Sequence, residues 1–272
     1  MSTAKRKPVL TMAQQADIHE LYEEAVQAVD GEVEYLVDTF KELRGREPIS
    51  FREDFCGTAS AACEWVRTHP ERIAIGVDND EATLEWGRAN RLGRLAEDDR
   101  PRVKLVHGDV LTAETERVDI VGAFNFSYYC FMTRQQLGEY FRRAREALNE
   151  DGMLVLDVFG GSEAFTVQKE KTKYEDFTYI WDQAEFDPVT HRMQCYIHFK
   201  FPDGSRLRKA FSYEWRIWTM PEIRELLEEA GFSKIRIYWE DEDEDGEANG
   251  EYYETETGEP DPAWIAYLVA ER

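Results

Sequence analysis

The sequence predicts an α/β fold built on a doubly wound, mostly parallel seven-stranded sheet. From residue 49 onward, short apolar segments of strand length alternate with amphipathic segments of helical length, which is typical of parallel strands joined by helices. Before this region, residues 12–44 carry apolar residues at helical spacing. After it, three strand-like stretches joined by hairpin turns predict an antiparallel β insertion.

The N-terminal segment is predicted to form a helical cap over residues 1–47. Its apolar residues recur every three to four positions between residues 12 and 44, and Gly31 is the expected break between two helices. Gly45 and Pro48 follow, and they end the segment because glycine favours a helix end and proline cannot continue a helix.

Five of the seven expected strands precede residue 160. The sequence IAIGVD has the continuous hydrophobicity of a strand that is buried on both faces. Segments of helical character at residues 57–68, 81–94 and 134–148 connect the strands. The five strands are expected at residues 49–54, 73–78, 103–106, 119–126 and 153–159.

The antiparallel insertion is expected to cover residues 160–218. Its strand-like stretches lie at residues 177–186, 193–201 and 206–218, and the sequences DPVT and PDGS between them are good hairpin turns. After the insertion, the alternation of helical and strand-like segments seen in the first half of the chain resumes.

The C-terminal part completes the predicted sheet. Capping signals predict a helix whose N-cap is Thr219 and which ends at Gly231. The remaining two strands are expected at residues 235–239 and 264–270. The acidic stretch between them, residues 240–259, is predicted to be a solvated loop.

The composition excludes several classes of partner. The chain has 33 Lys and Arg against 56 Asp and Glu, a net charge of −23, and such a surface repels nucleic-acid phosphates and anionic lipid. No apolar stretch follows the basic N-terminal residues, so we expect neither a signal peptide nor a membrane partner. The four cysteines form no C-x-x-C pair and no spacing predicts a metal site, which favours a cytoplasmic protein with free thiols.

Three acidic residues lie at or just beyond the ends of the first three expected strands: Glu53, Asp78 and Asp109. Ligands of open parallel sheets bind outside the carboxyl ends of the strands, so these side chains are expected to share one edge. Asp78 is suited to accept both hydroxyl protons of a nucleoside ribose. The small residues of the turn at 56–60 allow the backbone to approach a ligand closely.

These motifs, in this order, resemble those of the class I S-adenosylmethionine-dependent methyltransferases, which have a Rossmann-like fold. The resemblance covers most of residues 48–160. The family's acidic-x-Gly-x-Gly-x-Gly turn corresponds to residues 53–59, where Gly57 is the central glycine. Phe55 and Ala59 stand in place of the other two glycines, and Asp54 could replace Glu53 in its role.

The later motifs extend the resemblance. Gly76-Val77-Asp78-Asn79-Asp80 is similar to the family's ribose-binding motif, and Gly108-Asp109-Val110 to its adenine-binding turn. Residues 124–129 end the fourth strand, and in the family the residues at this position line the methionine half of the cofactor. The last two strands match the terminal antiparallel hairpin of the family. The resemblance implies S-adenosylmethionine as cofactor, S-adenosylhomocysteine as product, and a cofactor site made of Glu53, Asp54, Cys56, Gly57, Thr58, Asp78, Asn79, Asp109, Val110, Asn125 and Phe126.

The implied reaction is the in-line transfer of a methyl group to a nitrogen or oxygen nucleophile of a small molecule. Because the sulfonium is already activated, alignment and exclusion of water matter most, and the sequence designates no catalytic residue. We expect a single domain over residues 1–272, with a cofactor-binding core at 48–159 and 219–272 and the insertion as a lid on the acceptor side.

Aromatic residues of the insertion are candidates for binding the acceptor. Alternation along the strands places Phe177, Tyr179 and Trp181 on one face, and likewise Phe211, Tyr213 and Trp215. Such faces could hold a planar or cationic acceptor, or could equally be a hydrophobic cover. The candidate acceptor-binding residues are Tyr22, Tyr128, Tyr129, Trp181, Tyr213, Trp215 and Arg216.

Other functions remain open at this stage. The acceptor could be a protein or an RNA, although the negative charge disfavours RNA, and the acidic stretch could bind a basic protein. A nucleotide-binding scaffold without catalysis is a further alternative, supported by the degenerate glycine turn. A nicotinamide-dependent oxidoreductase is disfavoured because the glycine-rich fingerprint is absent.

Overall fold

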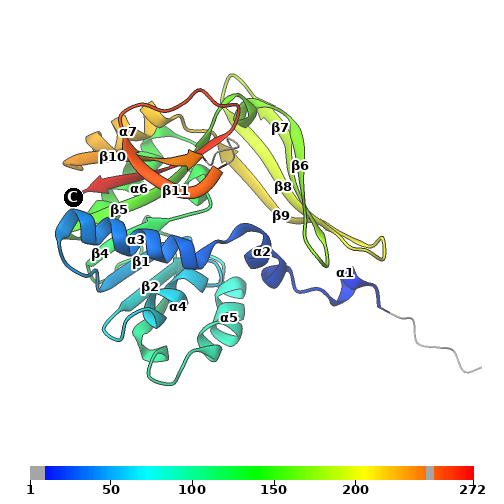
Figure 1. Cartoon of the computed structure of the whole chain (residues 1–272), viewed down its shortest axis with the longest axis horizontal. Coiled ribbons are helices and arrows are strands. Elements are labelled where there is room, and N and C mark those ends of the chain that lie inside the picture. The colour runs from blue at the N-terminus through cyan, green and yellow to red at the C-terminus, as the bar shows by residue number, and fades with distance from the viewer. Residues whose placement is uncertain (1–9, 243–247) are drawn as a thin grey trace, which may run out of the picture. The chain divides into compact units, whose positions relative to one another are not determined.

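The computed structural model describes residues 10–242 and 248–272, which form two compact units (Figure 1). The larger unit contains residues 27–164 and 216–272, and the smaller one contains the described residues up to 26 together with 165–215. None of the helices in the described ranges combines the length and hydropathy that a transmembrane helix needs.

The larger unit is built on an eight-stranded sheet with the strand order β11-β10-β12-β5-β4-β1-β2-β3. The strands β1 to β5 are parallel, and β12, β10 and β11 continue the sheet in antiparallel pairing. The predicted α/β fold is therefore confirmed. The strands are β1 (Ser50–Asp54), β2 (Ile73–Asp78), β3 (Val103–His107), β4 (Val118–Ala123), β5 (Leu148–Gly160), β10 (Lys234–Glu242), β11 (Ala248–Thr255) and β12 (Trp264–Glu271).

The strand β11 corrects the prediction that residues 240–259 form a solvated loop. Its pairing with β10 adds the eighth strand, and residues 243–247 of the same stretch lie outside the described residues. Tyr252 explains the difference, because its ring packs against Tyr267 at 4.7 Å and against Tyr35 at 5.7 Å between ring centroids. The Tyr252 ring therefore helps to hold an otherwise acidic strand on the sheet, together with the ion pair between Arg236 and Glu254.

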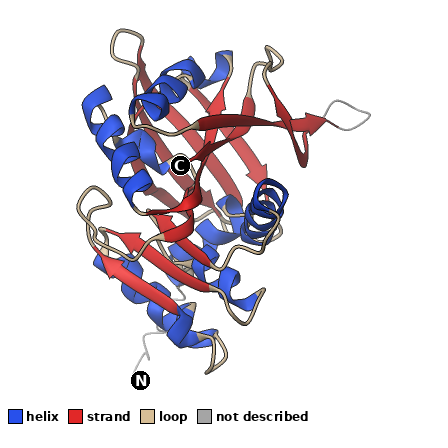
Figure 2. Ribbon diagram, turned by 90° about the vertical axis from the view of Figure 1, so that its left-hand side faces the viewer, coloured by secondary structure: helices blue, strands red, loops and turns tan. Residues whose placement is uncertain are grey.

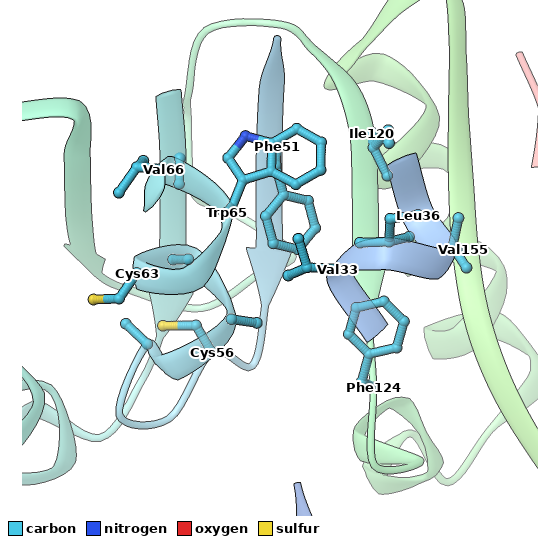
Figure 3. Close-up of a cluster of buried hydrophobic side chains, with 14 of the residues drawn as sticks. Val33, Leu36, Phe51, Cys56, Cys63, Trp65, Val66, Ile120, Phe124 and Val155 are labelled. Atoms are coloured by element: carbon cyan, nitrogen blue, oxygen red, sulfur yellow. The ribbon is translucent and has the colours of Figure 1, made fainter. Parts of the chain in front are cut away.

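Helices cover both faces of this sheet (Figure 2). On one face α3 (Val29–Arg44) and α4 (Ser60–Arg67) pack against β1, β4 and β5 through buried Leu36, Phe51 and Trp65, part of the cluster drawn in Figure 3. Helices α6 (Arg134–Glu146) and α7 (Met220–Glu229) pack together and against β5 and β10. The remaining helices of this unit are α5 (Glu81–Asn90), η1 (Leu92–Arg94), η2 (Arg100–Arg102), η3 (Ser127–Cys130) and η4 (Ser162–Phe165), the last of which ends at the unit boundary.

Two predicted helix boundaries can be compared with the structure. Thr219 and Glu222 form the predicted capping box of α7, in which the Thr219 N–H donates to the Glu222 carboxylate at 2.9 Å. The break expected at Gly31 was wrong, because Gly31 lies inside α3 and the chain leaves helical geometry earlier, at Ala28. A single glycine in a helix costs only about 1 kcal/mol relative to alanine, which is too little to end the helix by itself.

The smaller unit is a four-stranded antiparallel sheet with the order β6-β7-β8-β9. Helix α2 (Ile18–Val26) and the short helix α1 (Met12–Gln15) pack on the face that carries Phe177, Ile197 and Phe199. The strand β6 was not predicted, because its sequence QKEKTK has the polar composition of a protected sheet edge. The strands are β6 (Gln168–Lys173), β7 (Thr178–Asp187), β8 (Arg192–Lys200) and β9 (Arg206–Arg216, whose last residue lies at the unit boundary).

Candidate cofactor site

The turn after β1 is left-handed at residues 55, 57 and 59, the three positions where the motif that it resembles has glycines. Phe55, Gly57 and Ala59 have φ angles of 60°, 53° and 62°, so the left-handed conformation recurs at every second residue. A non-glycine residue adopts this conformation at a cost of roughly 1–2 kcal/mol. Backbone hydrogen bonds from Cys56 N to Val77 O and from Ala59 N to Cys56 O offset that cost.

Asp78 connects this turn to the end of β2. Its Oδ2 accepts the N–H of Gly57 at 2.8 Å, and its Oδ1 accepts the N–H of Asp80 at 2.9 Å. The half-buried carboxylate keeps further lone pairs for other donors. Asn79 beside it is exposed, and its carbonyl lies 3.2 Å from Nε2 of His107.

Asp109 lies on the loop after β3, next to the end of β2. The ladder pairs Asp78 with His107, and the Gly108 N–H donates to the Asp78 carbonyl at 2.9 Å. Asp109 is exposed and accepts the N–H of Leu111 at 2.9 Å, while Val110 is buried. Because β1, β2 and β3 are neighbouring parallel strands, the ends that carry Glu53, Asp78 and Asp109 meet at one edge of the sheet, as the sequence predicts.

Glu53 and Asp54 lie on opposite faces of β1. Glu53 is buried, and burial together with the charges of Glu32 and Asp78 raises its pKa. Within the described residues, its Oε2 has no hydrogen-bond partner. Asp54 instead forms a buried ion pair with Nε of Arg52 at 2.7 Å and accepts the hydroxyl of Tyr140 at 3.2 Å. We therefore assign Asp54 to the core and not to the cofactor site.

Cys56 and Thr58 are packed inside the turn. A Cβ on Gly76 would lie 2.7 Å from Sγ of Cys56, and a Cβ on Gly87 would lie 2.4 Å from the Thr58 carbonyl oxygen. Both side chains are buried, so these residues shape the backbone of the turn and do not offer side chains to a ligand.

Gly87→Ala is expected to destabilise the protein by about 1–3 kcal/mol and to weaken cofactor binding. The new methyl group would displace Thr58, which belongs to the turn. Thermal unfolding with and without S-adenosylhomocysteine measures both effects. Gly31→Ala is the control, because nothing lies within 4 Å of a Cβ at that position and alanine favours the helix. Equal behaviour of the two variants would contradict the prediction.

The loop after β4 is held by a residue that the sequence analysis missed. Asn125 and Phe126 have φ angles of 55° and 56°, and the Phe126 N–H donates to Oδ1 of Asp157 at 3.0 Å. Asp157 also accepts a backbone hydrogen bond from Asn125. Its buried carboxylate therefore fixes two residues in left-handed geometry. The signal for it was an acid inside the apolar strand MLVLDVF.

The candidate acceptor-binding residues fall into two groups. Tyr128 and Tyr129 are fully buried, with hydroxyls directed at the carbonyls of Asp157 and Phe159, so we remove them from the acceptor site. Arg216 hydrogen-bonds Glu222 at 3.0 Å and stacks on Trp218, which assigns it to the start of α7.

The other four candidates lie in the smaller unit. Trp181, Tyr213 and Trp215 form one aromatic cluster, with ring centroids 4.7–6.0 Å apart. Tyr22 of α2 belongs to the same hydrophobic cluster and packs against Phe211 at 4.8 Å. The structure thus brings these side chains together, partly beneath α2, in the arrangement of a hydrophobic core.

Solved structures of S-adenosylmethionine-dependent methyltransferases have a fold similar to that of this chain. A methyltransferase of this type from Clostridium acetobutylicum is 15% identical and has a TM-score of 0.67, over 93% of this chain and 96% of that one. CalS10, an amino pentose methyltransferase from Micromonospora echinaspora, is 15% identical with a TM-score of 0.66, over 98% and 100%. The sugar N-methyltransferase KedS8 from Streptoalloteichus is 15% identical with a TM-score of 0.63, over 100% and 97%.

Comparison by sequence gives no further relative. No family model matches the chain, and no curated protein matches it. The solved structures therefore establish the fold.

Proposed function

We propose that this protein transfers a methyl group from S-adenosylmethionine to a nitrogen or oxygen atom of a small molecule. The observation that carries the proposal is the turn at residues 55–59. Three of its residues adopt the left-handed conformation that glycine favours, and the Gly57 N–H of the turn donates directly to the Asp78 carboxylate. The turn and Asp109 lie at the edge of the sheet where ligands of this fold bind.

The residues at this edge fit the cofactor. Asp78 would accept the ribose hydroxyls, Asp109 the adenine amine, and the N–H of Val110 would face the ring. The turn and the loop at Asn125–Phe126 would border the methionine half. Glu53 lies at the same edge, and among the described residues its buried Oε2 atom has no hydrogen-bond partner. S-adenosylmethionine supplies an activated methyl group, and the protein supplies alignment and exclusion of water.

A small-molecule acceptor is supported by the fold neighbours, which include an amino pentose methyltransferase and a sugar N-methyltransferase. Tyr22, Trp181, Tyr213 and Trp215 remain our candidates for acceptor binding. The assignment of residues 160–218 as an acceptor-side lid and the cytoplasmic location also remain predictions.

Binding of S-adenosylhomocysteine tests the proposal directly. At about 100 times its Kd, the ligand should stabilise the protein by about 2.7 kcal/mol, which corresponds to a rise in Tm of roughly 5–10 °C. NAD at the same concentration should cause no rise, since the turn lacks the dinucleotide fingerprint. A rise with NAD alone, or with neither compound, would contradict the proposed function.

A further inference from the structure

An acidic pair and a group of tyrosines lie on the face of the large sheet that α3 covers. Phe51 on β1 and Val155 on β5 belong to the core beneath α3 (Figure 3). Side chains two residues apart on a strand share a face, so Glu53 and Asp157 lie on that same side at the carboxyl edge. Tyr267 pairs directly with Asp157 across the β5–β12 ladder.

Glu32 reaches this edge from the first turn of α3. Tyr35 lies one turn further along on the same side of the helix, and its ring stacks on Tyr267 with a centroid distance of 4.4 Å and an interplanar angle of 22°. Tyr267 pairs with Asp157, so this stacking brings the first turns of α3 to the side of the sheet that carries Asp157. The negative charge of Glu32 also raises the pKa of Glu53, Asp157 and Tyr267.

These carboxyls lack a cation. In the described parts of the chain no ion pair involves Glu32, Glu53 or Asp157, and the hydrogen bonds to Asp157 come from backbone N–H groups. The Glu53 carboxylate accepts a backbone hydrogen bond from Ala62, but its buried Oε2 atom has no donor among the residues that the structure describes. Burying several uncompensated carboxyls is costly, and a bound cation with N–H donors would relieve that cost.

The strand order separates this cluster from the nucleoside end of the site. Asp78 and Asp109 follow β2 and β3, whereas Asp157 lies on β5, three strands beyond β2. At about 4.8 Å per strand the separation along the edge is roughly 14 Å. The methionine half of the donor would lie between them, along the turn after β1 and the loop after β4, and Asp157 follows on the next strand, β5.

The geometry points to an acceptor that enters as an alkylammonium ion and is held by Glu32 and Asp157, so that the atom methylated is an amine nitrogen. This inference rests on the proposed function and narrows it from nitrogen or oxygen to nitrogen. Tyr35 and Tyr267 are stacked and Tyr252 packs edge-on against both, and these three rings add an aromatic surface that favours a cation.

The chemistry balances without a further reactant. A carboxylate takes one proton from the ammonium, and the nitrogen lone pair so freed forms the N–C bond. The C–S bond breaks, its electron pair stays on sulfur, and the product leaves as a methylammonium ion. The carboxyl proton is then released to water. Burial raises the pKa of Glu32 to about 7 and that of Asp157 to about 8, which brings both closer to an amine than an ordinary carboxyl would be.

Blocking amines tests the acceptor atom. A metabolite extract is incubated with the wild-type protein and methyl-labelled S-adenosylmethionine, before and after its amines are acetylated. Loss of label uptake after acetylation is expected. Uptake that survives acetylation, or no labelled amine from an untreated extract although S-adenosylhomocysteine binds, overturns the inference. Absence of S-adenosylhomocysteine binding would instead count against the proposed function.

The Glu32→Gln variant tests whether Glu32 holds and deprotonates the acceptor. It should lower the initial rate of label uptake by about 100-fold, the usual contribution of a general base, and leave the S-adenosylhomocysteine Tm shift unchanged. Glu34→Gln, an exposed acid on the same helix, is the matched control and should retain the wild-type rate. If Glu32→Gln weakens binding of S-adenosylhomocysteine but not of 5′-methylthioadenosine, which lacks the amino acid part, the cluster holds the donor's own ammonium and the inference is wrong.

Discussion

Replacing Asp78 with alanine is expected to abolish the rise in melting temperature that S-adenosylhomocysteine causes. In the proposed site the carboxylate would accept both ribose hydroxyls, and hydrogen bonds to a charged group contribute about 1.5–3 kcal/mol each. Losing two of them corresponds to a fall in affinity of more than 100-fold. The same substitution removes the acceptor for the Gly57 N–H, so the turn that faces the donor also loses its anchor.

Asp98→Ala is the control for this experiment, because Asp98 is an exposed aspartate on the same unit. It should show the wild-type Tm shift. Asp78→Asn separates the two roles of the carboxylate, since asparagine keeps one acceptor oxygen but lacks the charge. A wild-type shift in Asp78→Ala would remove the ribose assignment, and with it the main support for the proposed cofactor site.

The order of strands and the acids at their ends were predictable from sequence because both depend on local patterns. Buried parallel strands are continuous apolar runs, and IAIGVD with Asp78 at its end is such a run. The turn at 55–59 was harder to predict. Phe55 and Ala59 carry no sign of positive φ, and only the hydrogen bonds of the folded turn keep them there.

Residues whose role depends on tertiary contacts were missed or misassigned. Glu32 lies on an amphipathic helix, where an acid is normally a surface residue, and nothing local shows that it reaches the sheet edge. Asp157 is one polar residue in an apolar strand, and its partners, Asn125 and Phe126, lie about 30 positions away in the sequence. Asp54 follows Glu53 directly, and only strand alternation, seen once β1 is formed, directs its side chain to Arg52 on the opposite face of the sheet.

The assignment of Asp54 to the core leads to a prediction. The Asp54→Ala variant should unfold far more easily than the wild-type protein, while the chemistry of the cofactor site should stay in place. The Arg52 and Asp54 side chains are 2% and 0% exposed. Removing one partner of such a pair leaves an uncompensated buried charge and costs about 3–5 kcal/mol, or a fall in Tm of roughly 6–20 °C. Tyr140 would also lose its hydrogen-bond acceptor.

Two further variants distinguish a buried pair from a surface one. Glu116→Ala breaks the exposed pair with Lys104 and should change the stability by less than about 1 kcal/mol. The double variant Arg52→Met with Asp54→Leu should recover most of the stability lost in Asp54→Ala, because hydrophobic residues of similar volume can replace a buried ion pair. Chemical denaturation of the four proteins measures these differences. If Asp54→Ala folds normally but no longer binds S-adenosylhomocysteine, Asp54 belongs to the cofactor site after all, because a residue that only holds the core cannot lose the ligand without also losing stability.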